Sequence, residues 1–174
     1  MLYLGRPGGS MFKEWCAITD TFLNLEAQKQ ERILNAALRE FTEHSYKQAS
    51  TNRIVKEAGI GKGMLFYYFK SKKALFHYLI EYGKKYVTNE YLNQIDEKES
   101  DFIKKYQQAA QVKMKAIAKN PYVFNFLGTL YLNKEVELSK ELEAQLIEAK
   151  NLGLSKLFNN IDTSLFREDI ESDK

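Results

Sequence analysis

The sequence predicts an all-α protein built from two helical domains. Its 174 residues include only two prolines and nine glycines, and residues that favour helices, such as Lys, Glu, Gln, Ala and Leu, are frequent. Apolar residues recur at spacings of three and four along most of the chain, which is the period of a helix with one buried face. Hydrophobic residues make up 44% and charged residues 28%, as in soluble globular proteins, and no apolar run approaches the roughly 20 residues of a membrane span.

The rare reactive residues argue against an enzyme or a metalloprotein. Cys16 is the only cysteine, which excludes an internal disulfide and a thiolate metal cluster and fits a reducing cytoplasm. The two histidines, His44 and His77, have no recognisable catalytic or metal-binding neighbours, and the sequence has no phosphate-binding glycine loop or nucleophile elbow. We therefore expect a cytoplasmic protein without catalytic residues, metal or cofactor.

The first elements are expected to be an N-terminal extension and one long helix. The extension covers residues 1–24, and its first ten residues are rich in turn formers, so we expect the native protein to begin at or after Met11. The helix runs from Glu26 to His44 and should brace the helices that follow. Its apolar face consists of Ile33, Leu34, Ala37, Leu38 and Phe41.

Two short helices joined by a glycine turn follow a loop at residues 45–50. Thr51 is expected to cap the first helix, and Gly59 ends it because glycine readily takes the left-handed conformation found past a helix C-terminus. Gly61 then precedes the second helix, residues 62–69. This is the pattern of a helix-turn-helix, whose second helix lies in the major groove of DNA, although any small helical bundle can contain two such helices.

The positive charge of the chain is concentrated in the same segment. Seven basic residues and one acid lie between Ser45 and Leu75, so this segment carries +6, and because the whole chain carries +3 the remainder carries −3. A basic segment with interleaved tyrosines is typical of a protein that binds a phosphate backbone. A helical interaction module that binds an acidic protein or an anionic membrane surface is the alternative interpretation.

A fourth helix is expected to begin after Ser71, with Lys72 and Lys73 in its first turn. Cations at a helix N-terminus oppose the helix dipole unless an anion binds there, so this end is a candidate phosphate site. The helix would link the two halves of the chain through one stripe formed by Leu75, Leu79, Tyr82 and Tyr86.

Three further helices are expected in the second half. They cover residues 100–119, Pro121 to about Leu132, and Glu135 to about Ile161, the last with a bend near Gly153. Proline suits the first position of a helix because its missing N–H has no partner there. The helix that it begins is apolar nearly all round and should therefore be buried on more than one side.

Residues 33–79 resemble the N-terminal DNA-binding domain of the TetR family of bacterial transcriptional regulators. The resemblance is carried by an alanine-rich helix that ends in Phe41, followed in fixed order by Thr51 and the motifs A-G-I, K-G, Y-F and S-K-K-A-L. It implies a ligand-responsive regulator, most often a repressor, that binds a palindromic operator in double-stranded DNA as a homodimer. It also implies a helix-turn-helix domain at residues 25–85 and a ligand-binding and dimerisation domain at residues 86–174.

Members of this family usually finish with two further helices that pair across the dimer. This chain ends at Lys174, just after the position where those helices would begin. We therefore expect the second domain to be incomplete, and the homodimer to depend on whether other surfaces can replace these helices.

The resemblance and the charge pattern together give candidates for DNA contact. Thr51, Tyr68 and Lys72 are expected to bond phosphates. Base edges are expected to be read by Lys62, Gly63, Met64 and Tyr67, because lysine reaches guanine acceptors and glycine allows close approach. At Phe66 the family more often has tyrosine, so one phosphate-bonding hydroxyl is lost and a ring able to contact a thymine methyl remains. The full set is Lys47, Thr51, Arg53, Lys62, Gly63, Met64, Phe66, Tyr67, Tyr68, Lys72 and Lys73.

Candidates for an effector pocket come from aromatic and flexible apolar residues on the later helices. Such residues at helical spacing are more often core than ligand contacts, so core packing is the favoured interpretation for each of them individually. Few charges interrupt residues 121–132, so an effector should be small and apolar or aromatic. The candidates are Tyr82, Tyr86, Tyr106, Met114, Phe124, Phe126, Leu127 and Tyr131.

Overall fold

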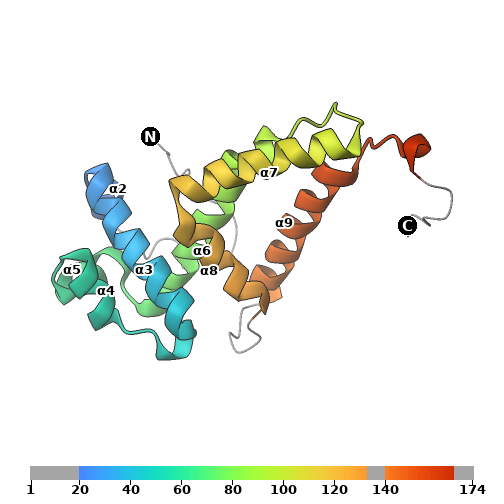
Figure 1. Cartoon of the computed structure of the whole chain (residues 1–174). Helices are drawn as coiled ribbons and strands as arrows, with labels where there is room; N and C mark the ends of the chain where they lie inside the picture. Colours follow the sequence, from blue (N-terminus) through green and yellow to red (C-terminus); the bar gives the residue numbers. More distant parts are fainter. Residues whose placement is uncertain (1–19, 133–139, 167–174) are drawn as a thin grey trace. The chain divides into compact units, whose positions relative to one another are not determined.

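The computed structural model describes residues 20–132 and 140–166, and these residues form helices with short connections (Figure 1). No strand occurs within the described ranges, so the all-α prediction is confirmed. None of the helices in these ranges is long and apolar enough to cross a membrane. The described residues divide into two compact units, one formed by residues 20–86 and 120–132 and the other by residues 87–119 and 140–166.

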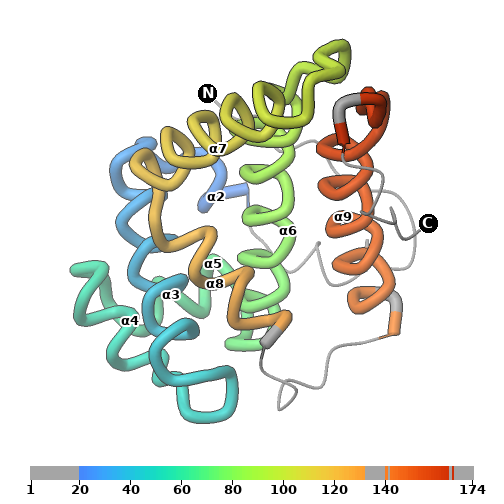
Figure 2. Tube along the Cα trace, turned by 45° about the vertical axis from the view of Figure 1, so that its right-hand side comes forward, coloured from blue at the N-terminus to red at the C-terminus, as the bar shows by residue number. Residues whose placement is uncertain are grey.

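The described part of the first unit is built around the long helix α3. Its helices are α2 (Asp20–Leu23), α3 (Ala27–Gln48), α4 (Thr51–Ala58), α5 (Lys62–Phe69), the greater part of α6 (Lys72–Glu90), and α8 (Pro121–Leu132). Both α4 and α8 pack against α3 (Figure 2). The sequence places α8 far from α3, so this contact closes the unit over a long separation along the chain.

Aromatic rings fill the core of the first unit. Phe22 from α2 is fully buried, and its ring centroid lies 4.6 Å from that of Phe69. Phe76 from α6 contacts Phe41 from α3 at 5.0 Å and Phe126 from α8 at 5.5 Å between centroids. Each buried ring contributes about 1.5–3 kcal/mol through the apolar surface that it removes from water. The core therefore joins α2, α3, α5, α6 and α8.

The helix α3 extends further than the sequence predicts. It continues to Gln48, but Ser45 has φ 54° and ψ 171°, so the regular helix is interrupted close to the predicted end at His44. The last turn beyond Ser45 is held by Tyr46, whose ring lies 4.8 Å from that of Phe76. Part of the expected loop is thus a helical turn packed on α6.

The second unit has a smaller core. It contains the 3-10 helix η1 (Leu92–Gln94), α7 (Phe102–Lys119), α9 (Lys140–Phe158) and the 3-10 helix η2 (Thr163–Leu165). Leu92, Ile95 and Ala109 are buried together, with Leu157 of α9 packed against them. The helix α9 is continuous through Gly153, and the first residues of the expected last helix, 135–139, lie outside the described residues.

The boundaries of the two units differ from the division expected at residue 85. The helix α8 belongs with the first unit, because its buried residues Val123 and Phe126 pack within that core. At the N-terminus, α2 also belongs to the first unit because Phe22 is part of the same core. The expected extension at residues 1–24 therefore ends inside the domain, and residues 1–19 lie outside the description.

Candidate nucleic-acid interface

The helix α4 begins one residue away from the expected cap. Ser50 takes the N-cap position with φ −112° and ψ 118°, and Thr51 is the first helical residue. The backbone N–H of Ser50 donates to Oε1 of Glu40 at 2.7 Å, which holds Ser50 in the extended conformation that precedes the helix. The prediction of Thr51 as the N-cap is therefore wrong.

The turn between α4 and α5 has the predicted glycine geometry. Gly59 lies in the left-handed region with φ 65° and ψ 39°. The N–H of Ile60 donates to the carbonyl of Val55 at 3.0 Å, and the N–H of Gly59 donates to that of Lys56 at 3.4 Å. This pair of bonds is the Schellman closure of a helix, which requires a residue with positive φ just past the helix. Gly61 then occupies the N-cap of α5.

The helix α5 has one buried side and one exposed side. Leu65, Tyr68 and Phe69 are at most 2% exposed and belong to the core. The four side-by-side candidates for base contact, Lys62, Gly63, Met64 and Tyr67, are all exposed. The side chains of Met64 and Tyr67 are 41% and 51% exposed. The structure thus brings these four residues together on the outer face of α5.

Gly63 sits at a point where the free protein leaves open space. A Cβ atom placed on Gly63 would have no heavy atom of the protein within 4 Å. Its φ is also not positive, so neither backbone geometry nor internal packing requires glycine here. A requirement for close approach at Gly63 would therefore come from outside the chain.

Tyr68 is not available for the phosphate bond that the sequence predicts. Its side chain is fully buried beside Phe22, with ring centroids 5.7 Å apart, and beside Phe69. Its hydroxyl has no hydrogen-bond partner among the residues that the structure describes. The prediction is wrong because α2 covers this side of α5. The half-buried Phe66 keeps part of its ring accessible.

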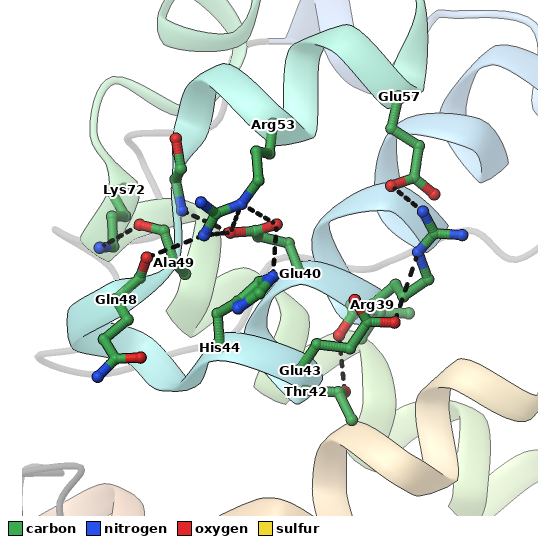
Figure 3. A network of polar contacts seen from close by, with 12 residues as sticks. Arg39, Glu40, Thr42, Glu43, His44, Gln48, Ala49, Arg53, Glu57 and Lys72 are labelled. Carbon is green, nitrogen blue, oxygen red and sulfur yellow. Dashed lines mark hydrogen bonds and ion pairs between the residues drawn. The ribbon is translucent and has the colours of Figure 1, made fainter.

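Glu40 organises the edge where α3 meets α4 (Figure 3). Its side chain is only 6% exposed and accepts bonds from Arg53, with Nη2 at 2.6 Å from Oε1 and Nε at 3.0 Å from Oε2. Arg53 also donates from Nη2 to the carbonyl of Gln48 at 3.0 Å. His44 lies close by, with Nε2 at 3.9 Å from Oε2 of Glu40. The guanidinium of Arg53 is therefore engaged by the protein itself.

The protonation of Glu40 follows from these contacts. Burial raises the pKa of its carboxyl, but the hydrogen bonds from Arg53 and from the N–H of Ser50, together with the charges of Arg53 and His44, outweigh burial and lower the pKa below its ordinary value. The bond to Glu40 in turn raises the pKa of Arg53. Both groups are charged at neutral pH, and the pair is an ion pair.

Lys72 is held at the other side of the same connection. Its Nζ donates to the carbonyls of Ala49 at 2.7 Å and Lys47 at 3.3 Å, and lies 4.9 Å from the centroid of the Tyr46 ring. Burial lowers the pKa of Lys72, against the opposing charge of Glu40. An ammonium has three donors, so one N–H remains for a phosphate.

The start of α6 has the cap that the sequence predicts. The hydroxyl of Ser71 accepts from the N–H of Ala74 at 3.0 Å. Lys73, beside Lys72, is exposed, as is Lys47 in the last turn of α3. The candidate cations thus lie at both ends of the helix-turn-helix.

The candidates for an effector pocket are distributed over the two units. In the first unit Tyr86, Phe126 and Leu127 are buried, and the ring of Tyr86 lies 6.4 Å from that of Tyr82 and 6.3 Å from that of Phe124. These residues pack against one another and serve as core. In the second unit Tyr106 and Met114 are 57% and 64% exposed, and in the first unit Tyr131 is 48% exposed, so these three are not core residues.

Glu40 is the residue of this region that the sequence reasoning missed. It follows Ala36 and Ala37 at spacings of four and three, which is the period of the buried face of α3. A carboxylate at an apolar position of a helix indicates a buried partner, and this signal could have identified Glu40.

Comparisons with known proteins match the N-terminal part of the chain. Residues 33–79 match the family described as bacterial regulatory proteins, tetR family. Helix-turn-helix transcriptional regulators from Staphylococcus aureus strains USA300 and NCTC 8325 are each 41% identical over 54 residues, which cover 31% of this chain and 29% of theirs. The matched part thus spans less than a third of the length of these curated relatives.

Solved structures resemble a larger part of the chain. A TetR family transcriptional regulator from Chloroflexus aurantiacus J-10-FL superposes with a TM-score of 0.60 and 26% identity, over 80% of this chain and 76% of that one. A TetR-like transcriptional regulator from Rhodococcus sp. RHA1 superposes with a TM-score of 0.50 and 20% identity, over 76% and 78% of the two chains, and shows a similar fold.

Proposed function

We propose that the chain regulates transcription by reading a DNA sequence with α5, because residues 33–79 match the family described as bacterial regulatory proteins, tetR family. The observation that carries the proposal is the outer face of α5, where Lys62, Gly63, Met64 and Tyr67 are exposed together. A helix of this kind, braced by α3 and α4, is suited to the major groove of DNA.

The chemistry of this face suits base edges. The ammonium of Lys62 can donate to the O6 and N7 acceptors of guanine. The side chains of Met64 and Tyr67 can contact thymine methyl groups, and Gly63 lets the backbone approach the bases. The partly exposed ring of Phe66 lies beside them on the same helix. The mixture of one cation and several apolar groups predicts a preference for particular base pairs.

Phosphate contacts come from residues that flank α5. Lys47 and Lys73 are exposed, Thr51 opens α4, and Lys72 retains one N–H after its two bonds to carbonyls. Such contacts fix the position of a protein on DNA and make its affinity depend on salt, without reading the sequence. We assign these four residues to positioning on the duplex.

The regulatory part of the proposal is a two-state mechanism. Two copies of the chain place their α5 helices about 34 Å apart in successive major grooves of a palindromic operator. A small apolar or aromatic effector that binds one state better than the other would change this spacing through α6, which contains the boundary between the two units. Repression relieved by the effector is the proposed mode of action.

The alternative partner of the basic segment is an acidic protein or an anionic membrane surface. The match of residues 33–79 to a family of DNA-binding domains favours double-stranded DNA instead. Competition separates these partners, because heparin and anionic vesicles offer charge without base edges. A sequence-specific protein prefers its duplex over both at physiological salt.

The experiment that tests the proposal is selection of genomic DNA fragments by the purified chain at about 150 mM salt, where non-specific binding is weakened. The solution mass of the protein is measured in parallel. The proposal predicts enrichment of one inverted repeat and a mass of two chains on DNA. Binding that is blind to sequence and is displaced equally by heparin would contradict it.

A further inference from the structure

We infer that Glu40 is a positioning residue for DNA binding, and that Arg53 acts with it as part of the support behind α4 instead of contacting a phosphate. The inference rests on the proposed function, because it concerns how the same helix-turn-helix is held. Glu40 lies on α3 and contacts the basic segment, residues 45–75, through Ser50 and Arg53, in a region where an exposed carboxylate would repel DNA. Its side chain is buried and points its charge at the protein.

The guanidinium of Arg53 already makes several hydrogen bonds within the protein. Its Nε contacts both oxygens of Glu40 at 2.9 and 3.0 Å, and its Nη2 contacts Oε1 at 2.6 Å and the carbonyl of Gln48 at 3.0 Å (Figure 3). Moving the guanidinium to a phosphate would break these bonds and leave a buried carboxylate without its cation, which is costly. Arg53 is therefore tied to the protein.

The network of Glu40, Arg53 and Lys72 holds the backbone that leads from α3 into α4. The last residue of α3 and the two residues that lead to α4 each have a backbone group bound by a side chain from a different helix. The carbonyl of Gln48 accepts from Arg53 of α4, that of Ala49 from Lys72 of α6, and the N–H of Ser50 donates to Glu40 of α3. The entry to α4 is thereby fixed in place, and α4 leads directly through the Gly59 turn to α5.

A second ion pair, Arg39–Glu57, also joins α3 to α4. Arg39 of α3 donates to Glu57 of α4 at 2.7 Å, but the side chains of Arg39 and Glu57 are 44% and 35% exposed. Arg39 also lies 3.8 Å from Glu43 of α3. No described backbone group of the connection is bound by this pair. An exposed pair contributes little to stability, so Glu57 is a matched control for Glu40.

The first test compares Glu40→Gln with Glu57→Gln. Both substitutions remove one negative charge from the α3–α4 contact, so long-range attraction to DNA rises equally. We expect Glu40→Gln to weaken binding to the selected DNA by about tenfold or more, because charge-assisted bonds that hold α4 are lost. Glu57→Gln should bind within about twofold of wild type, or more tightly. Binding of Glu40→Gln as tight as that of Glu57→Gln would overturn the inference.

The second test changes Arg53 at constant charge. Lysine keeps a point charge for a phosphate but cannot reproduce the fork that joins Glu40 to Gln48. Arg53→Lys should therefore lose affinity like Glu40→Gln, and the double variant Glu40→Gln, Arg53→Gln should lose no more than the larger single loss. Arg53→Lys with wild-type affinity, together with a salt slope reduced by about one in Arg53→Gln, would assign Arg53 to a phosphate and overturn the inference.

As a control for folding, the thermal unfolding of each variant is measured by circular dichroism. DNA binding is then measured at a temperature well below the unfolding midpoint of that variant. Because Arg53→Lys keeps the charges of both residue 40 and residue 53, this variant provides the test if Glu40→Gln does not fold. If the wild-type protein shows no sequence-specific DNA binding, both the proposed function and this inference are overturned. Wild type that binds while Glu40→Gln matches it would overturn the inference alone.

Discussion

Candidate DNA-binding cations lie on the outer face of α5 and around the connection between α3 and α4, but the two groups differ in their contacts within the protein. Within the described residues the side chain of Lys62 on α5 has no hydrogen bond or ion pair. By contrast, the side chains of Arg53 and Lys72 each bind backbone carbonyls, and Arg53 is also paired with the buried Glu40. Basic charge in the sequence therefore covers two roles. Groups that remain unpaired are suited to an outside partner, and groups that are paired hold the frame.

The largest loss of DNA affinity is expected from an acidic residue on the outer face of α5. Met64→Glu would place a carboxylate against DNA, and like-charge contact of this kind costs several kcal/mol, roughly a hundredfold or more in affinity. The free energy of unfolding should change by less than about 0.5 kcal/mol because Met64 is 41% exposed. Equilibrium binding and urea unfolding measure both. Gln107→Glu adds the same charge on an exposed position of α7 and should bind as wild type does.

Two glycines separate a requirement of the fold from a requirement of the partner. Gly59→Ala should lower the free energy of unfolding by about 1–2 kcal/mol, because Gly59 has φ 65°. Gly63→Ala should leave it unchanged or raise it by up to about 1 kcal/mol, since a Cβ there meets no atom within 4 Å. Affinity for the selected DNA should nevertheless fall in Gly63→Ala. Unaltered affinity in that variant would show that α5 does not approach the bases closely at this point.

Lys72 tests whether a cation can serve both roles. Lys72→Ala should weaken binding to all sequences alike, and the slope of log affinity against log salt should fall by about 0.9 for the one phosphate lost. Binding is measured at several salt concentrations on selected and unrelated DNA. A uniform loss with an unchanged slope would instead mean that Lys72 only holds the carbonyls of Lys47 and Ala49.

The smallest effect is expected at Tyr68. Tyr68→Phe removes a buried hydroxyl that has no partner among the described residues, so stability should stay the same or rise by up to about 1 kcal/mol. Affinity for DNA and its salt dependence should not change. A loss of affinity with a lower salt slope would restore the phosphate contact that the sequence predicts. Thermal unfolding and the same binding titration decide between the two.

Local signals predicted the helix-turn-helix well. The helix α5 has the bounds expected from the sequence, and α4 ends at Ala58 as expected, because Gly59 takes the left-handed conformation that closes the helix. The start of α6 at Lys72, after the Ser71 cap, is likewise decided by a hydroxyl and the first turn of the helix. The exposed face of α5 follows from helical period, since Leu65 and Phe69 occupy the core.

Features that depend on distant residues could not be predicted in the same way. Tyr68 is buried because Phe22, which is 46 positions earlier, packs on it. The N-cap moves from Thr51 to Ser50 because Glu40 of α3 binds the N–H of Ser50. The place of α8 in the first unit depends on its contact with α3, and no periodicity within α8 identifies that partner. The errors at Tyr68 and α8 concern contacts between segments far apart in the sequence, whereas Glu40 lies only 10 residues before Ser50.

The measurement that tests the account most directly is a base-by-base affinity profile. Wild type, Lys62→Ala and Lys72→Ala are titrated against the selected DNA and against every single-base variant of it. We expect Lys62→Ala to lose about 1–3 kcal/mol of discrimination between the selected base and the other bases at one or two positions, and to keep the wild-type discrimination at the other positions. Lys72→Ala should keep the wild-type profile at all positions, with a lower affinity throughout. A profile of Lys62→Ala that is lowered evenly at all positions would contradict the reading of bases by α5.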